Sequence, residues 1–485
     1  MSHSFSILFA GAEASPLVKL GGLGDVVGSL PRALRRAGHD VRIIIPRYGT
    51  INLEGYQINW QDSFSIPFMG SRQDIAITEV LLQDRTSVYL VENERYFERT
   101  AIYGEADDLE RFFLFSQAAM EVPKRANWQP DILHCHDWHT GMVVPLLKVD
   151  HRDDAFYSAC ASVFTIHNLA YQGWFDDLFA ARAGLYDYLP PPSDPFRDKT
   201  YSMTGLGIYY GDIISTVSET YAGEILTPEY GEGLETLLQW RQDSLFGIIN
   251  GIDYEQFDPS TDRVIAANYD VNNLDRRIAN KLTLQAKVGL PVDAETPLIG
   301  MAGRLVDQKG PDIAAEALEL LLPDADVQFI LQGTGETRYQ ELLQKLESLH
   351  TRKARMFLAL DFSLAQLIFA GCDIFLMPSL FEPCGLTPLI AMHYGAIPVV
   401  RRTGGLIETV RECDSDLSSG LGFVFEKYDA SDLLAALRRA LAAFQKKDQW
   451  HKLMVRAMQA DFSWKTSLHK YEALYAMARW KALAA

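Results

Sequence analysis

The feature of this sequence that most limits its possible folds is the alternation of short apolar runs with stretches of helical periodicity along nearly the whole chain. Such alternation predicts β-α-β units, and therefore parallel sheets covered by helices. The runs typical of buried strands are residues 6–10, 41–46, 132–136, 162–167 and 213–217 in the first half, and 298–302, 327–332, 355–359, 374–378, 397–400 and 422–425 in the second. We therefore predict an α/β protein with two doubly wound sheets.

The length of the chain, 485 residues, predicts two domains. A single hydrophobic core stops growing at about 250 to 300 residues. The sequence GIINGIDYEQFDP at residues 247–259 breaks a strand with Asn-Gly and an Asp- and Pro-rich loop. We place the boundary there and predict Rossmann-like domains at residues 1–250 and 251–460, facing a central cleft, with a helix at 461–485 that crosses back to the first domain. The alternating pattern of residues 51–91 predicts an antiparallel insertion or edge ribbon.

The charge balance excludes some classes of partner. Lys and Arg total 45 against 63 Asp and Glu, a net charge of −18, which disfavours nucleic acid and anionic membranes as partners. The five cysteines form no CxxC pair, which indicates a reducing compartment and no zinc site. No uncharged apolar run approaches the roughly 20 residues that span a bilayer. We expect a cytoplasmic protein, or a plastid or granule-associated one if a transit peptide has been removed.

The first candidate ligand site is the sequence KLGGLGD at residues 19–25, which follows the first predicted strand and opens a helix. Gly21 and Gly22 let the backbone approach a ligand, and the N-terminus of the helix attracts an anion. Together with Lys19 they indicate a phosphate-binding loop. The alternative is a tight strand-to-helix turn in which Lys19 is solvated and Asp25 is a cap or a first-turn acid.

A dinucleotide-binding fold is the rival interpretation of this loop. The spacing is not a clean GxGxxG, since Gly22 and Gly24 are followed by Gly28. Such folds also place an acid at the end of the second strand for the ribose of NAD. This chain has Arg47 there, which would suit only NADP.

Polar residues also follow two later strands of the first half. The sequence HCHDWH at residues 134–139 suggests a metal, but consecutive residues at a strand end point to opposite faces and cannot converge on one ion. We expect instead that Asp137 and one histidine point into the cleft while Trp138 packs. His167 and Asn168 end the next strand, where α/β sheets bind ligands. A His/Asp network that only orders the loop, and a core polar pair at 167–168, are the alternatives.

The second half carries a pair of cations in the loop GRLVDQKG at residues 303–310. Arg304 and Lys309 can both reach one diphosphate, the arginine as a bidentate fork and the lysine as a compact charge. The alternative is a surface loop with solvated cations. A chain with a charge of −18 that binds a nucleotide needs its cations placed at the site.

A carboxylate follows the strand at 374–378 in the sequence FEPCGLTP, residues 381–388. Glu382 lies between an aromatic residue and a proline, which hold it rigidly. The N–H groups of Gly385, Leu386 and Thr387 would open a helix and point at an incoming anion. The alternative is that Glu382 is an ordinary acid at a helix start.

Taken together, these motifs resemble the glycogen and starch synthase family of glycosyltransferases, which have the two-Rossmann-domain GT-B architecture. The matching sequences, in the family's order, are KLGGLGD (19–25), HCHDWHTG (134–141), FTIHNLAYQG (164–173), NGID (250–253), GRLVDQKG (303–310), FEPCGLTPL (381–389) and TGGL (403–406). They extend over nearly the whole chain. Seven motifs in order are far more specific than any one of them.

The resemblance implies transfer of glucose from ADP-glucose, or from UDP-glucose, to the non-reducing 4-hydroxyl of an α-1,4-glucan with retention of configuration, and it implies neither a metal nor another cofactor. By the same resemblance, the catalytic residues are Arg304, Lys309, Glu382, Asp137 and His167. The residues that contact the nucleotide sugar are Lys19, Gly21, Gly22, Asp25, Asn168, Arg304, Lys309, Cys384, Gly385, Leu386 and Thr387. Those that contact the sugar or the acceptor are Tyr103 and His139. Leu360 stands where the family tends to have an aromatic residue for the base, which leaves the preference for adenine over uracil open.

Three other functions remain as alternatives at this point. One is a different GT-B transferase, such as a sucrose-phosphate-type enzyme. The second is an NADP-dependent oxidoreductase, which the motifs of the second half contradict. The third is a non-catalytic glucan-binding scaffold, in which we would expect Arg304, Lys309 or Glu382 to be lost; all three are present. The sequence predicts no oligomeric state.

Overall fold

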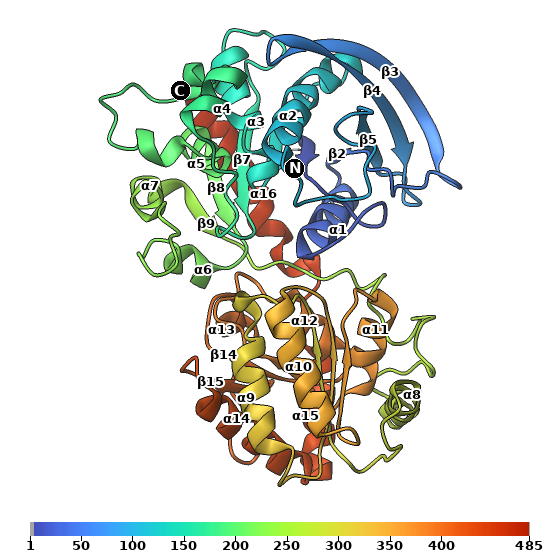
Figure 1. The fold of residues 1–485 in the computed structure, drawn as a ribbon. Helices are drawn as coiled ribbons and strands as arrows, with labels where there is room; N and C mark the ends of the chain where they lie inside the picture. The colour runs from blue at the N-terminus through green and yellow to red at the C-terminus, as the bar shows by residue number, and fades with distance from the viewer. Residues whose placement is uncertain (1–3, 485) are drawn as a thin grey trace. The chain divides into compact units, whose positions relative to one another are not determined.

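The computed structural model describes residues 4–484, which form two compact units (Figure 1). Unit 1 contains the chain up to Gly251 and again from Trp464 onward. Unit 2 is Ile252–Ser463. The C-terminal segment therefore packs in unit 1, although it follows unit 2 in the sequence.

Unit 1 is built on a mixed sheet whose central part is parallel. Its strands are β1 (Ser6–Ala10), β2 (Asp40–Pro46), β3 (Gln57–Phe68), β4 (Ser71–Leu81), β5 (Ser87–Glu92), β6 (Ile132–His136), β7 (Ala161–Ile166), β8 (Ile213–Thr216) and β9 (Leu245–Gly247), in the spatial order β3-β4-β5-β2-β1-β6-β7-β8-β9. The run β5-β2-β1-β6-β7-β8 is the 3-2-1-4-5-6 order of a Rossmann fold. β1, β6 and β7 are buried almost throughout, as expected for strands covered on both faces.

The segment predicted to be an antiparallel insertion or edge ribbon is an edge ribbon of this sheet. β3 and β4 pair antiparallel, and β4 pairs antiparallel with β5. β5 in turn pairs parallel with β2, so the ribbon continues the main sheet (blue strands in Figure 1). Near the turn, Phe64, Ile66 and Phe68 face inward while their neighbours are more exposed, which accounts for the alternating sequence.

Helices cover this sheet, and several of them begin at side-chain caps. The helices of unit 1 are α1 (Gly22–Arg36), α2 (Asp108–Arg125), α3 (Val143–Pro145), α4 (Asp177–Ala183), α5 (Met203–Tyr210), α6 (Glu219–Glu224), α7 (Glu235–Trp240) and α16 (Trp464–Ala484). Asp176, Ser202 and Ser218 each accept a hydrogen bond from the backbone N–H three residues later, at α4, α5 and α6. No helix within residues 4–484 is both long enough and apolar enough to cross a bilayer.

The C-terminal helix α16 is part of the unit 1 core. Trp464 Nε1 donates to Ser29 Oγ at 2.7 Å at its start. Further along, the Tyr475 hydroxyl lies 2.9 Å from Nδ1 of His134 on β6, and both side chains are fully buried. Unit 1 is therefore completed by the last residues of the chain.

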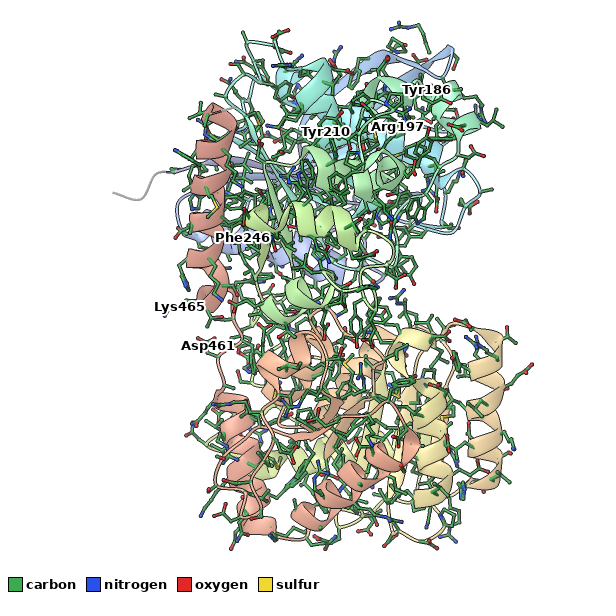
Figure 2. All side chains as sticks on the ribbon, turned by 90° about the vertical axis from the view of Figure 1, so that its left-hand side faces the viewer. Tyr186, Arg197, Tyr210, Phe246, Asp461 and Lys465 are labelled. Carbon is green, nitrogen blue, oxygen red and sulfur yellow. The ribbon has the colours of Figure 1, made fainter. Side chains whose placement is uncertain are left out.

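Tyr475→Phe is expected to lower the free energy of unfolding by about 1 to 3 kcal/mol, because it leaves the buried Nδ1 of His134 without this partner. Urea unfolding followed by circular dichroism measures the change. The control is Tyr186→Phe, which removes a hydroxyl from an exposed ring (Figure 2) and should change stability little. Equal stability of Tyr475→Phe and the wild type would contradict a stabilising contact.

Unit 2 is a second Rossmann-like unit, with a sheet that is parallel throughout. Its strands are β10 (Leu298–Ala302), β11 (Gln328–Gln332), β12 (Ala354–Phe357), β13 (Ile374–Met377), β14 (Ile397–Arg401) and β15 (Phe423–Phe425), in the order β12-β11-β10-β13-β14-β15. Its helices are α8 (Ile278–Val288), α9 (Pro311–Leu321), α10 (Thr337–Leu349), α11 (Phe362–Gly371), α12 (Leu386–His393), α13 (Gly405–Thr409), α14 (Ala430–Phe444) and α15 (Lys447–Gln459). This is again the 3-2-1-4-5-6 order.

Candidate active site

In each unit, the strand order places some of the predicted residues at a topological switch point of the sheet. Such points lie between the first and fourth strands of the doubly wound order, and ligands bind there beyond the carboxyl ends of the strands. In unit 1 the two strands are β1 and β6, whose loops carry the glycine motif and Asp137. In unit 2 they are β10 and β13, whose loops carry Lys309 and Glu382.

The glycine-rich loop of unit 1 leads directly into α1. Gly21 is the N-cap, with extended backbone, and as a glycine it supplies no side-chain cap to the helix. The Nζ of Lys19 lies 2.6 Å from Oδ1 of Asp25, and both side chains are less than one-fifth exposed. Asp25 is thus the first-turn acid, one of the two local roles considered for it, and it holds Lys19 beside the N-terminus of the helix.

Glu13, which no sequence motif indicates, holds this loop through hydrogen bonds to its backbone. It follows β1 and is 2% exposed. Its Oε2 accepts hydrogen bonds from the N–H groups of Leu20 at 2.5 Å and Gly21 at 3.3 Å, and its Oε1 accepts one from the Tyr103 hydroxyl at 3.0 Å. Burial raises the pKa of this carboxyl to about 7. The only sequence signal was a lone acid in the apolar stretch FAGAEASP.

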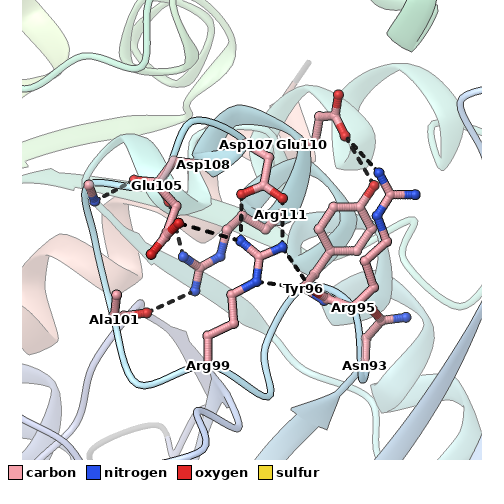
Figure 3. Close-up of polar contacts among 11 residues, drawn as sticks. Asn93, Arg95, Tyr96, Arg99, Ala101, Glu105, Asp107, Asp108, Glu110 and Arg111 are labelled. Atoms are coloured by element: carbon pink, nitrogen blue, oxygen red, sulfur yellow. Dashed lines mark hydrogen bonds and ion pairs between the residues drawn. The ribbon is translucent and has the colours of Figure 1, made fainter.

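Tyr103 lies between β5 and α2. Charged side chains hold the backbone on both sides of it, at Arg99 and Asp107 (Figure 3). Arg99 donates from both terminal nitrogens to the carboxylate of Asp107, each at 2.7 Å. Arg111, fully buried on α2, donates to Asp108 at 3.1 Å and packs beneath the same loop. Bidentate and buried arginine pairs restrict geometry strongly, so the position of Tyr103 is well defined.

His134 and His136 on β6 and His167 after β7 form a buried polar row. Nδ1 of His136 lies 2.9 Å from Nε2 of His167, and Nε2 of His134 lies 2.6 Å from Oγ1 of Thr165. Burial lowers the pKa of His134 and His136 well below the usual range and that of His167 to about 3, so all three are neutral. Among the described residues, no group of three or more His, Cys, Asp or Glu is arranged to hold a metal ion.

Asp137 connects the ends of β6 and β7. Its Oδ1 accepts hydrogen bonds from the N–H groups of His167 at 2.7 Å and Asn168 at 3.4 Å. Its backbone has a φ of 57°, which is unfavourable for a residue with a side chain and is common at functional sites. Burial raises the pKa of its carboxyl to about 7. The structure therefore brings three predicted residues, Asp137, His167 and Asn168, into one cluster.

His139 lies apart from that cluster, within aromatic side chains. Its ring centroid is 4.2 Å from that of Trp138, 4.6 Å from that of Phe112 and 4.7 Å from that of Tyr103. It is 7% exposed, and burial lowers its pKa to about 3. The two residues predicted to contact sugar or acceptor, Tyr103 and His139, are thus ring neighbours.

In unit 2, Lys309 and Glu382 form a largely buried ion pair. The lysine Nζ lies 2.6 Å from Oε2 of Glu382, whose side chain is 7% exposed. The Ser379 hydroxyl, which the sequence analysis did not single out, donates to the same oxygen at 3.0 Å. Gly310, directly after Lys309, has a φ of 67°, and an added Cβ would lie 2.2 Å from the carbonyl oxygen of Pro378. Only glycine therefore allows the two loops to approach this closely.

Arg304 begins the same loop but is not part of the ion pair. Its side chain is exposed, and Nη2 donates to Oε1 of Gln308 at 3.4 Å. The backbone of Gln308 accepts a hydrogen bond from Leu380, which ties the loop after β10 to the loop after β13. The cations predicted to act together are thus held on one loop, with Lys309 directed at Glu382.

The start of α12 supplies backbone donors beside this pair. Gly385 is the N-cap with a φ of 87°, and as a glycine it supplies no side-chain cap to the helix. Leu386 and Thr387 form its first turn and are partly exposed, while Cys384 is 5% exposed. The carbonyl oxygen of Glu382 accepts a hydrogen bond from the N–H of Gly405 at 3.0 Å, so the TGGL motif supports this loop.

Comparisons with known proteins match both units. Residues 6–240 match the family described as starch synthase catalytic domain, and residues 285–452 match glycosyl transferases group 1. A glycogen synthase of Moorella thermoacetica is 43% identical over 489 aligned residues, 100% of this chain and 99% of that protein. The catalytic domain of starch synthase IV from Arabidopsis thaliana, solved with ADP and acarbose, has a TM-score of 0.92 and 33% identity, covering 98% of this chain and 100% of that one. A sucrose-phosphate synthase from Thermosynechococcus elongatus, with 18% identity, a TM-score of 0.61 and coverage of 97% and 98%, shares the fold.

Two Rossmann-like units with these matches define a glycosyltransferase of the GT-B class. That class was predicted from the resemblance that the motifs carry, and it is confirmed. Within the class, the identity of 43% over the full chain is decisive. The chain belongs to the glycogen and starch synthase family.

Proposed function

We propose that the protein transfers glucose from ADP-glucose to the non-reducing 4-hydroxyl of an α-1,4-glucan, with retention of configuration. The observation that carries this proposal is the Lys309–Glu382 pair at the switch point of unit 2, beside the start of α12, whose N-cap is Gly385. A cation and backbone N–H groups suit a diphosphate, and a carboxylate suits a sugar with oxocarbenium character. The Arabidopsis neighbour was solved with ADP and acarbose, which supports an adenine nucleotide and a glucan-like ligand.

In this proposal Arg304, Lys309 and the start of α12 bind the diphosphate and stabilise its charge as the bond to the glucose C1 breaks. Glu382 contacts the transferred glucose, with Cys384 and Gly385 beside the phosphates. Asp137, neutral His167 and Asn168 bind and orient the glucose and the acceptor. In unit 1, Lys19, Gly21, Gly22 and Asp25 contact the nucleotide sugar, and Tyr103 and His139 contact the sugar or the acceptor.

The bond changes in this proposal balance without a covalent enzyme adduct. The acceptor O4 forms a bond to C1 on the face from which the diphosphate departs, and the bond from C1 to the phosphate oxygen breaks. The proton of O4 passes to the departing phosphate oxygen. Asp137 and Glu382 position the reactants. A trapped glucosyl adduct on either carboxylate would contradict this sequence of steps.

The test is a comparison of initial rates of glucose incorporation into glycogen from ADP-glucose and from UDP-glucose at equal concentration. We expect incorporation from ADP-glucose to exceed that from UDP-glucose by about tenfold, the order of one favourable base contact. Digestion of the product by a β-amylase shows whether the new bonds are α-1,4. A higher rate with UDP-glucose would overturn the donor assignment. Transfer to fructose 6-phosphate instead of glycogen would overturn the acceptor assignment.

A further inference from the structure

We propose that Glu13 is a positioning residue that fixes the glycine-rich loop and Tyr103 in one arrangement for transfer. The inference rests on the proposed function, because it assigns Glu13 a part in presenting the glycine-rich loop to the nucleotide sugar and Tyr103 to the sugar or the acceptor. Glu13 itself is 2% exposed and acts through its neighbours rather than on the substrate.

The two oxygens of this carboxylate serve two different loops. Oε2 accepts from the N–H groups of Leu20 and Gly21, directly before α1, and Oε1 accepts from Tyr103, in the loop before α2. A carboxylate is planar and rigid, so a displacement of either loop displaces the acceptor of the other. Charge-assisted hydrogen bonds of this kind are about twice as strong as neutral ones.

The packing leaves the carboxylate little freedom to move. A Cβ added at Gly24 would lie 3.0 Å from Oε2 of Glu13 and 3.2 Å from Cβ of Lys19, so the carboxylate lies against the first turn of α1. Tyr48, fully buried after β2, donates its hydroxyl to the carbonyl oxygen of Ala12, the residue before Glu13. The side chain and its backbone are thus held from two sides.

The charged groups that interact with Glu13 are negative, and they disfavour the loss of its proton. Asp25 on α1 and Asp137 after β6 are the carboxylates that interact with it, and Tyr48 and Tyr103 face it as neutral phenols. Arg111 on α2 is the cation that interacts with Tyr48, while Lys19 pairs with Asp25. The pKa of Glu13 is raised from 4.5 to about 7. The larger cause is burial away from water, and the smaller one is the negative charge of Asp25.

This raised pKa gives a readout in which stability and activity change in opposite directions. Between pH 4.5 and about 7 the unfolded chain loses the Glu13 proton while the folded chain keeps it. Stability from this group is therefore full below pH 4.5, falls as the pH rises to about 7, and is lowest above it. Glutamine has nearly the same shape but no charge, so Glu13→Gln removes this loss of stability at pH 8. A residue with a merely structural role would instead lose stability when its charge is removed.

The experiment is Glu13→Gln at pH 8, assayed with ADP-glucose and glycogen and by thermal unfolding. The amide has one oxygen in place of two, so either the loop N–H groups or Tyr103 loses its acceptor. We expect kcat/KM for ADP-glucose to fall about tenfold while Tm is equal to or above that of the wild type. The control is Glu79→Gln, a carboxyl that is 5% exposed on β4 and bonds to Asn59 at 2.7 Å, which should leave kcat/KM unchanged.

A double-mutant cycle shows whether Glu13 acts through Tyr103. Tyr103→Phe alone should lower kcat/KM about tenfold. The double variant should lose much less than the hundredfold expected of independent changes, because both substitutions remove the same hydrogen bond. Multiplicative losses would overturn the coupling. Normal kinetics for Glu13→Gln, or a fall in activity that follows a fall in Tm, would overturn the positioning role.

Failure of the proposed function is distinguishable from failure of this inference. A wild type that transfers no glucose from ADP-glucose would contradict the function alone. Amide hydrogen exchange, measured without substrate, would then test whether Glu13 positions the two loops. The amides of Leu20 and Gly21 should exchange faster in Glu13→Gln and in Tyr103→Phe than in the wild type. Unchanged exchange in both variants would overturn the coupling of the two loops.

Discussion

Lys309→Ala is expected to lower kcat/KM for ADP-glucose by about a thousandfold, a loss of about 4 kcal/mol of transition-state stabilisation. The change removes the cation that we place at the departing diphosphate. It also leaves the buried carboxylate of Glu382 without its partner at 2.6 Å. The charge develops on the leaving group as the bond breaks, so kcat should fall more than KM rises.

Steady-state rates with glycogen as acceptor measure this loss. Lys345→Ala, which removes an exposed lysine of α10 in the same unit, is the matched control and should keep the wild-type rate. Lys309→Arg keeps the charge but changes its shape, and should recover part of the activity. A rate for Lys309→Ala within a few fold of the wild type, with the protein folded by circular dichroism, would contradict a role in binding the diphosphate.

Glu382→Gln should be the second most damaging substitution, with a fall in kcat of about a hundredfold or more. The amide has nearly the shape of the carboxylate, and its oxygen can still accept from the Ser379 hydroxyl, now 3.0 Å from Oε2. What is lost is the negative charge beside Lys309 and beside the glucose. Single-turnover measurements separate the chemical step from product release.

Two outcomes decide the role of Glu382. Glu336→Gln, an exposed acid in the same unit, provides the control and should have no effect. A loss below tenfold for Glu382→Gln would show that the carboxylate serves mainly to hold Lys309 and the loop after β13. A large loss with an unchanged Tm would place its effect on the reaction rather than on folding.

Much of the fold could be predicted from local sequence. Each predicted apolar run overlaps a strand, because a strand that is buried on both faces must be apolar nearly throughout. The strand predicted to break near residue 247 is β9, whose start could not be predicted because three residues carry too little pattern. The position of the ribbon in the sheet was also open, because local alternation does not reveal that β5 pairs with β2.

The site was less predictable, because its contacts join distant parts of the chain. Local motifs identified Lys309 and Glu382 separately, but their ion pair joins residues 73 positions apart. Glu13 has no neighbouring motif and is found only through its hydrogen bonds to Leu20 and Tyr103. Likewise, the loop around His139 is explained by rings that come from other elements.

The return of the chain to unit 1 at Trp464 has a consequence for biosynthesis. Ile252 and Ser463 form a parallel bridge, and the N–H of Ile252 donates to the carbonyl oxygen of Phe462 at 2.8 Å, so the outgoing and returning segments are joined (Asp461 and Lys465 in Figure 2 flank the return). During synthesis, all of unit 2 leaves the ribosome before α16 does. The earlier half of the chain must therefore wait, with the His134 face of its sheet uncovered, until the later half has been made.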